Sequence, residues 1–359
     1  MHAESLKATR GVKLAAVCDV KRTRAAEKAK KYRCPAYTDY RKMLREERLD
    51  AVHICTPHYL HKQMILEAAK RGVNVLTEKP MGLDPKEAAS EISAAKKAGI
   101  TLGVIFQNRF NPGSQLVKKR IVEGKLGQLK AARLVLSYHK PDSFYKKSDW
   151  KGRSSKEGGG VVIDQAIHFL DLLRWLAPGP IDYVEAHCAN RMHSFINVED
   201  SADGVIMFKS GFCAVFHLIN YYSYDDDPEI EIDCEKARVN MVKDSASIEY
   251  KSGRRETAGP RSTELIDYGP GARSYWGSCH FHQIREFYEA LRAGRKPAVT
   301  AEDAARTQAL VAAIYESSRL RQRVYLENPK SQYRNPKQIL NHKPQTSSFE
   351  FRYSDLFSI

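Results

Sequence analysis

Residues 73–106 read VNVLTEKPMGLDPKEAASEISAAKKAGITLGVIF, and this stretch decides the fold. The apolar runs VNVLT (73–77) and ITLGVIF (100–106) are each predicted to form a buried strand. The segment between them carries helix boundary residues, namely an N-cap, a first-turn proline, a capping-box acid and a terminal glycine (Asp84, Pro85, Glu87 and Gly99). A strand, a capped helix and a second strand predict one parallel βαβ unit.

The same alternation continues toward the N-terminus. LAAVC (14–18) precedes a helical stretch at 21–32, and AVHIC (51–55) precedes a helix that ends at Gly72. Strands that alternate with helices at this spacing predict an α/β fold with a doubly wound, Rossmann-like parallel sheet. The ligand of such a sheet binds at the carboxyl ends of its strands.

The pattern changes after about residue 125. Longer strands follow one another through turns, in the segments KAARLVLSYH, YVEAHCA, SADGVIMFKSG, FCAVFHLINYYS, EIEIDCE and ARVNMV. One helix interrupts them at 164–177, and two more are predicted at 279–293 and 301–322. These elements predict an α+β second domain with a mostly antiparallel open sheet.

The predicted organisation therefore has three parts. Residues 1–124 form the dinucleotide-binding domain and residues 125–327 form the domain for substrate and oligomerisation. Residues 328–359 lack periodicity and are predicted to form an extended tail.

Composition narrows the class of protein. The net charge of +15 favours anionic ligands, but the basic residues are spread over most helices, so a nucleic-acid partner is not expected. No apolar run approaches the roughly 20 residues of a membrane helix, and no secretory signal is visible. The seven cysteines stand singly without a CxxC pair, which predicts reduced thiols, a cytoplasmic protein and no metal site.

Three strand ends of the first domain gather polar residues. CTPHYLH (55–61), TEKPMG (77–82) and FQNRF (106–110) all follow predicted strands and should meet at one edge of the sheet. In TEKP, Lys79 is held on a short segment that a proline stiffens. By itself Lys79 fits a solvated loop lysine beside Glu78 as well as a functional one.

The second domain contains a further polar group in KEGGGVVIDQAIHFLDLLRWL. Asp164 and His168 are four residues apart, which places both on one face of a half-buried helix. A carboxylate beside an imidazole suits a general base, but it equally suits a core histidine satisfied by its neighbour. The three preceding glycines would let the backbone approach a ligand.

Taken in order, these motifs resemble the Gfo/Idh/MocA oxidoreductases, the relatives of glucose–fructose oxidoreductase and inositol dehydrogenase. The resemblance runs from about residue 2 to residue 325. It rests on the strand-end acid of AAVCDV, on TPHYLH, EKP, FQNRF and GKLGQLKAARL, and on the GGGVVIDQAIHFLDLLRWL helix. Ala166 stands where that helix usually has glycine.

The resemblance implies NAD(P)-dependent hydride transfer between nicotinamide and a secondary hydroxyl of a sugar, sugar derivative or cyclitol. His168 would take the hydroxyl proton, Asp164 would hold His168 and the substrate, and Lys79 would stabilise the developing oxyanion. Arg109 and Trp150 would line the substrate pocket. The resemblance also implies a set of cofactor-binding residues, namely Asp19, Thr56, Pro57, His61, Glu78, Lys79 and Gln107.

The start of the chain departs from this pattern. Asp19, at the end of the strand in GVKLAAVCDV, matches the acid that binds the adenosine ribose and favours NAD, although Lys21 and Arg22 would also tolerate NADP. The preceding strand and GxGxxG loop are absent, and MHAESLKA resembles the helix that follows such a loop. We therefore expect the natural start to lie upstream of Met1.

Two other functions stay open from the sequence. Some members of the family use bound NAD for glycoside hydrolysis, and a chain that lacks its phosphate loop could be a non-catalytic binding protein. The open sheet of the second domain, as in relatives, predicts a homodimer or homotetramer. Which sugar is bound depends on loops near 139–157 and 270–282, whose shapes the sequence leaves open.

Overall fold

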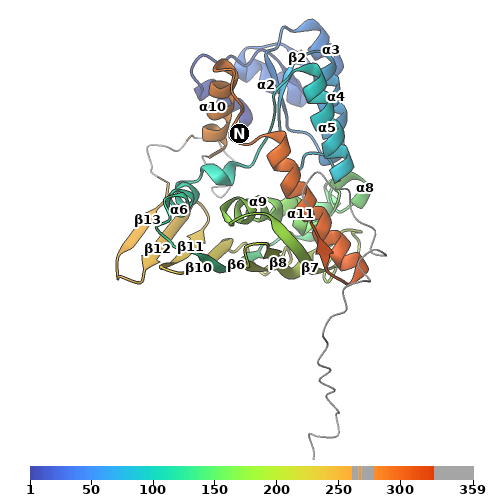
Figure 1. Cartoon of the computed structure of the whole chain (residues 1–359). Helices are drawn as coiled ribbons and strands as arrows, with labels where there is room; N and C mark the ends of the chain where they lie inside the picture. The colour runs from blue at the N-terminus through green and yellow to red at the C-terminus, as the bar shows by residue number, and fades with distance from the viewer. Residues whose placement is uncertain (261–265, 267, 269–278, 327–359) are drawn as a thin grey trace, which may run out of the picture. The chain divides into compact units, whose positions relative to one another are not determined.

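In the computed structural model, the described residues form two small parallel sheets and one large sheet (Figure 1). The structure describes residues 1–260, 266, 268 and 279–326. The predicted tail and most of the predicted loop at 270–282 lie outside the described residues. No helix of the described part is both long and apolar enough to cross a membrane.

The first half is the predicted parallel α/β arrangement. β1 (Val17–Cys18) pairs with β2 (Ala36–Tyr37), and β4 (Asn74–Thr77) lies between β3 (Ala51–Ile54) and β5 (Leu102–Val104). No strand of the described residues joins β1 to β3. The helices of this half are α1 (His2–Ala8), α2 (Arg22–Tyr32), α3 (Tyr40–Glu46), α4 (His61–Lys70) and α5 (Pro85–Ala98).

Local capping explains where α5 begins and ends. The Asp84 side chain accepts hydrogen bonds from the backbone N–H groups of Lys86 and Glu87. Gly99 ends the helix at a φ of 67°, in the left-handed region that favours glycine. The Glu87 carboxylate reaches back to the N–H of Leu83, one residue before the N-cap. These boundaries confirm the predicted βαβ unit.

The second half contains a nine-stranded sheet with the order β13-β12-β11-β10-β6-β9-β8-β7-β14. Its neighbouring strands are antiparallel except for β6 and β9, which run parallel. The strands are β6 (Leu129–Ser137), β7 (Ile181–Ala189), β8 (Ser201–Phe208), β9 (Cys213–Ile219), β10 (Glu229–Cys234), β11 (Ala237–Val242), β12 (Ser245–Tyr250), β13 (Arg255–Ala258) and β14 (Val324–Tyr325). The predicted mostly antiparallel sheet is confirmed, and β12 to β14 extend it.

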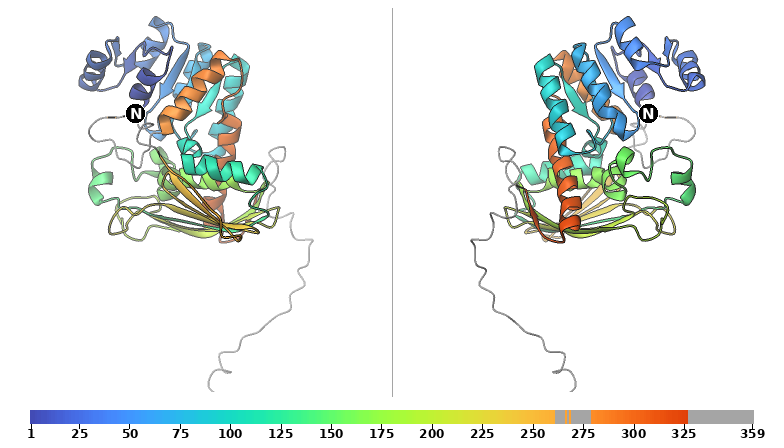
Figure 2. Two further views of the ribbon diagram at one scale, coloured as in Figure 1. Left: turned by 90° about the vertical axis from the view of Figure 1, so that its left-hand side faces the viewer. Right: turned by 90° about the vertical axis from the view of Figure 1, so that its right-hand side faces the viewer.

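Helices cover one face of this sheet (Figure 2). They include α6 (Pro112–Val122), α9 (Ile167–Leu176) and α11 (Ala301–Leu320), while α7 (Asp142–Lys146) and α8 (Ser154–Glu157) are short connecting helices. On β9, Ala214, Phe216 and Leu218 are buried, whereas Val215 and His217 point to the opposite, exposed face. No described helix covers that second face.

α10 (Cys279–Arg292) packs against the first half of the chain rather than against the large sheet (Figure 1). Its Ile284 and Phe287 form an apolar cluster with Leu6, Leu76 and Ile105. The Gln283 side chain bonds the backbone N–H of Phe106 and the carbonyl oxygen of Val104. The parallel strands are therefore covered by a helix that lies almost 200 residues further along the chain.

Candidate active site

Lys79 follows the carboxyl end of β4 and reaches across to the second half. Its Nζ donates to the carbonyl oxygen of Asp164 at 2.5 Å and lies 3.3 Å from Oδ1 of the same residue. Only 13% of the Lys79 side chain is exposed, so this contact is sheltered from solvent. The structure thus brings together two of the predicted catalytic residues from different halves of the molecule.

Asp164 is the centre of a buried polar cluster. Besides Lys79, its carboxylate accepts hydrogen bonds from the Lys151 ammonium and, at 2.5 Å, from the Gln165 amide. Nε2 of His58 lies 3.5 Å from Oδ1. Burial alone would raise the pKa of Asp164, but the charges of Lys151 and Lys79 hold it well below its usual value. Asp164 is therefore a carboxylate at neutral pH.

His168 lies one turn further on, but it does not bond to Asp164. Residues Val162–Ala166 form a π turn, η3, so positions four apart no longer stack as they do in a regular α-helix. His168 Nδ1 is buried and has no hydrogen-bond partner among the described residues. The predicted contact in which Asp164 holds His168 is absent, because the wide turn directs the carboxylate toward Lys79 and Lys151.

The environment of His168 keeps its imidazole neutral. Burial, followed by the charge of Lys79, lowers the pKa of His168 to about 3. The ring meets Phe106 edge to face, with 6.1 Å between the ring centroids. A neutral imidazole with a free nitrogen can accept a proton from a ligand.

The glycines before the π turn let the backbone pack closely against Glu199 and Tyr315. The Glu199 carboxylate accepts hydrogen bonds from the backbone N–H groups of Gly160 and Val162, and also from the hydroxyl of Tyr315. A Cβ atom at Gly160 would lie 1.8 Å from the Glu199 carbonyl oxygen, and one at Gly159 would lie 2.0 Å from the Tyr315 hydroxyl. The close approach predicted for a ligand is made here by the protein's own β8 entry segment.

Three neighbours of Asp164 were missed by the sequence analysis. Lys151 and Glu157 come from the connection before the glycines, where no spacing rule marks them, and His58 belongs to the TPHYLH motif. His58 Nδ1 lies 2.8 Å from the carbonyl oxygen of Glu157. Burial and the charge of Asp164 raise the pKa of Glu157 to about 7. No signal in the sequence marks Lys151, because its contact with Asp164 is made by tertiary packing.

The two predicted pocket residues have different surroundings. Trp150 borders the cluster, with its ring centroid 4.7 Å from that of His58 and 4.2 Å from the Lys151 ammonium. Arg109 is buried elsewhere and forms ion pairs with Asp171 at 2.6 Å and Asp303 at 2.5 Å. The structure therefore brings Trp150 to the cluster and leaves the Arg109 guanidinium engaged in a separate network.

The residues predicted to hold the cofactor lie at the strand ends. Asp19 follows β1 and is partly exposed, and its carboxylate accepts a hydrogen bond from the N–H of Lys21 at 2.8 Å. Thr56 and Pro57 follow β3 and lead into the short 3₁₀ helix η1 (His58–Leu60).

His61 is fully buried, with its two ring nitrogens 2.8 Å from the carbonyl oxygens of Thr56 and Pro80. Burial lowers the pKa of His61, so the neutral ring has one N–H, which can donate to one of these two carbonyl oxygens. His61 thus lies between two strand-end loops.

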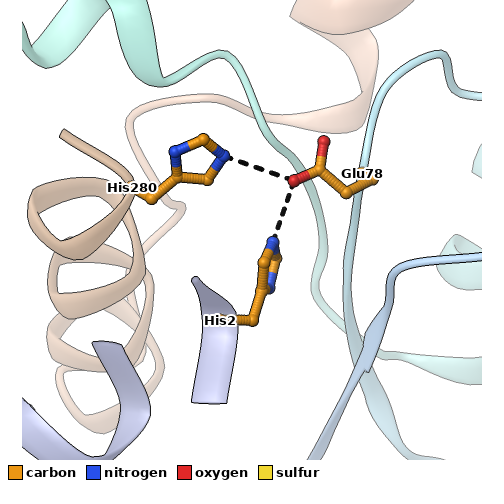
Figure 3. A group of neighbouring side chains, drawn as sticks. All are labelled: His2, Glu78 and His280. Atoms are coloured by element: carbon orange, nitrogen blue, oxygen red, sulfur yellow. Dashed lines mark hydrogen bonds and ion pairs between the residues drawn. The ribbon is translucent and has the colours of Figure 1, made fainter. Parts of the chain in front are cut away.

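Glu78 and Gln107 complete the predicted set. The Glu78 carboxylate contacts His2 and His280, as Figure 3 shows. Gln107 opens the 3₁₀ helix η2 (Gln107–Phe110), and its buried Oε1 has no hydrogen-bond partner in the described residues. Buried polar atoms are rarely left without a partner, so Gln107 Oε1 and His168 Nδ1 fit a site completed by a polar ligand.

Comparisons with known proteins identify the family of both halves of the chain. Residues 1–106 match the oxidoreductase family with an NAD-binding Rossmann fold. Residues 114–240 match the GFO/IDH/MocA C-terminal domain.

Similar curated proteins include two inositol dehydrogenases. Myo-inositol 2-dehydrogenase of Thermotoga maritima is 25% identical over 84% of this chain and 88% of its own length. Scyllo-inositol 2-dehydrogenase (NAD(+)) of Bacillus subtilis is 26% identical over 84% of this chain and 86% of its own length. Among solved structures, levoglucosan dehydrogenase in complex with NADH and levoglucosan matches the fold with a TM-score of 0.81. That match is 20% identical and covers 91% of this chain and 95% of the other.

Proposed function

Since the chain belongs to the GFO/IDH/MocA family of oxidoreductases, with an NAD-binding Rossmann domain, we propose that it oxidises a secondary hydroxyl of a sugar, sugar derivative or cyclitol, or reduces the matching ketone. The contact between Lys79 and Asp164 carries this proposal. It joins the strand end of the nucleotide domain to the helix that holds His168. Ligands of doubly wound sheets bind at the carboxyl ends of the strands, which supports this edge as the meeting point of cofactor and substrate.

In the proposed reaction, His168 accepts the hydroxyl proton while hydride leaves the same carbon. The pKa of about 3 keeps the imidazole neutral, so the base is available throughout the physiological range. Nε2 is the candidate for this role, because it makes no hydrogen bond within the described residues and, unlike Nδ1, is not among the buried atoms.

Lys79 and Asp164 act on the substrate oxygen and its neighbours. The Lys79 ammonium is the nearest fixed positive charge for an oxygen that becomes negative as its proton leaves. Asp164 holds that ammonium in place and offers an ionised carboxylate to an adjacent hydroxyl. Lys151 shares the Asp164 carboxylate and fixes its orientation from the other side.

The nicotinamide cofactor would be held by this chain's strand ends. Asp19 is suited to a ribose hydroxyl and would repel a 2′-phosphate, which favours NAD over NADP. Gln107 offers its unpartnered Oε1 on the same edge. When bound, NAD supplies the carbon that receives the hydride.

The test is a panel of inositols, hexoses and sugar phosphates assayed for NADH and NADPH appearance. We expect activity with NAD on at least one polyol, and Lys79→Met and His168→Ala should each lower kcat by about 10²–10⁴-fold in folded protein. Lys97→Met, at an exposed position on α5, is the matched control. Near-normal kcat in a folded Lys79 or His168 variant would remove that residue from the mechanism. Release of an aglycone without net NADH would indicate glycoside hydrolysis instead.

A further inference from the structure

Three side chains that are remote in sequence converge on one point (Figure 3). His2 begins α1, Glu78 follows β4, and His280 lies in the first turn of α10. The Nε2 atoms of His2 and His280 lie 2.9 and 3.3 Å from Oε1 of Glu78. One ligand atom from each residue lies within 4.8 Å of the others.

We propose that His2, Glu78 and His280 form a binding site for Zn²⁺. Two imidazole nitrogens and one carboxylate are a common zinc ligand set that leaves a fourth position for water. Zinc bonds of about 2.0–2.2 Å place neighbouring ligands about 3.3 Å apart in a tetrahedron, close to the separations seen here. Mg²⁺ and Ca²⁺ prefer oxygen ligands, so this set selects against them.

A second layer of hydrogen bonds orients the first ligand. Nδ1 of His53 lies 2.8 Å from Nδ1 of His2, and Nε2 of His53 lies 3.1 Å from the Tyr288 hydroxyl. In the metal-free chain Nε2–H of His2 donates to Glu78. Loss of that proton on metal binding would free the Nε2 lone pair for the ion, while an Nδ1 proton stays directed at His53. Such outer partners fix the tautomer and ring orientation of zinc-binding histidines.

The surroundings also suit a cation. The side chains of His2, Glu78 and His280 are 11%, 23% and 8% exposed, so the ligands are largely shielded from water. Binding Zn²⁺ displaces the hydrogen-bonding proton between imidazole and carboxylate, which leaves to solvent.

The ion would cross-link α1, the segment after β4, and α10. Glu78 also belongs to the predicted cofactor-binding set, so the ion is tested without cofactor. The three segments that the ion connects are distant in sequence. Because a ligand that binds only the folded state stabilises it, zinc should raise the thermal midpoint even without cofactor or substrate.

The experiment uses the full chain after chelator treatment, without nucleotide or sugar. Calorimetry with ZnCl₂ should show one saturable site of one equivalent, and the thermal midpoint should rise with ZnCl₂ concentration, whereas MgCl₂ should do neither. Co²⁺ should give the visible absorption of a tetrahedral site. Removing the outer partner in His53→Gln should weaken Zn²⁺ binding by about 10–100-fold.

His280→Ala should abolish the saturable site, while His280→Asp, which keeps a ligand atom, should retain weaker binding. His282→Ala, two residues along the same helix, is the matched control and should bind like the unmodified chain. Equal zinc binding by the folded His280→Ala variant, or no saturable site in the unmodified chain, would overturn the proposal. Because no cofactor is present, neither result bears on the dehydrogenase assay.

Discussion

Two neighbouring lysine side chains keep the buried Asp164 carboxyl ionised. Lys79 and Lys151 come from different halves of the chain, and both lower the pKa of the buried carboxyl. Removing one ammonium removes part of this stabilisation of the carboxylate, so the pKa of Asp164 must rise.

We therefore predict that Lys151→Met moves the acid limb of the kcat/KM profile upward by about one pH unit. The reason is that protonated Asp164 can no longer hold Lys79 as an ion pair. The pH dependence of kcat/KM measures this shift, and Lys97→Met, an exposed lysine on α5, is the control. An unchanged acid limb would mean that ionisation of Asp164 is not needed for turnover.

Among single elements, the helix α5 contains a buried glutamate, Glu91, whose carboxylate has no hydrogen bond in the described residues. Both carboxylate oxygens of Glu91 lack hydrogen bonds among the described residues, and burial raises its pKa to about 8, with Glu87 adding to the effect. A carboxyl whose folded-state pKa is raised contributes stability below its unfolded pKa. That contribution is lost as the pH rises through 8.

Glu91→Gln should therefore remove this pH dependence. At pH 5 the variant and the unmodified chain should have similar free energies of unfolding. At pH 9 the variant should be more stable by about 2–4 kcal/mol, because it avoids ionising a buried group. Denaturant titrations at the two pH values provide the measurement, with exposed Glu27→Gln as control. A constant difference between the variants at both pH values would argue against the raised pKa.

A second prediction for a single element concerns the glycines before η3. Gly160→Ala should destabilise the fold by about 3 kcal/mol or more, because its Cβ would overlap the Glu199 carbonyl and break two hydrogen bonds. The free energy of unfolding and kcat should fall together. Gly179→Ala, which meets no atom within 4 Å but has a φ of 84°, should cost only about 1–2 kcal/mol. Similar losses in both variants would show that conformational strain, not overlap, sets the cost.

Element boundaries were predictable where short-range rules apply. The caps of α5, at Asp84 and Gly99, follow from neighbouring residues, and the alternation of strand and helix follows from hydrophobic periodicity. The π turn at Val162–Ala166 depends on anchoring by Glu199, about 35 residues away, so periodicity predicted a regular helix there. Lys151 could not be predicted for the same reason, since tertiary packing alone brings it to Asp164.

At the scale of the whole molecule, the face of the large sheet that no described helix covers predicts self-association. Val215 is 47% exposed in the middle of that face, beside polar partners such as His217. We expect a dimer or tetramer, and Val215→Glu should dissociate it by placing a charge in the interface. Light scattering at micromolar concentration decides this, with Val122→Glu, 75% exposed on α6, as control. A monomeric unmodified chain would contradict the prediction.

The position of α10 does not follow the order of the sequence. This helix comes after most strands of the large sheet in the chain, but it packs against the first half. Phe287 rests against Gly103, and Gln283 holds the end of β5, so the parallel strands are completed by a helix encoded far downstream. A chimera joined near residue 124 would pair one parent's strands with the other parent's α10. Relatives that exchanged substrate halves by recombination would need two crossovers, or a matching α10, to keep the nucleotide half intact.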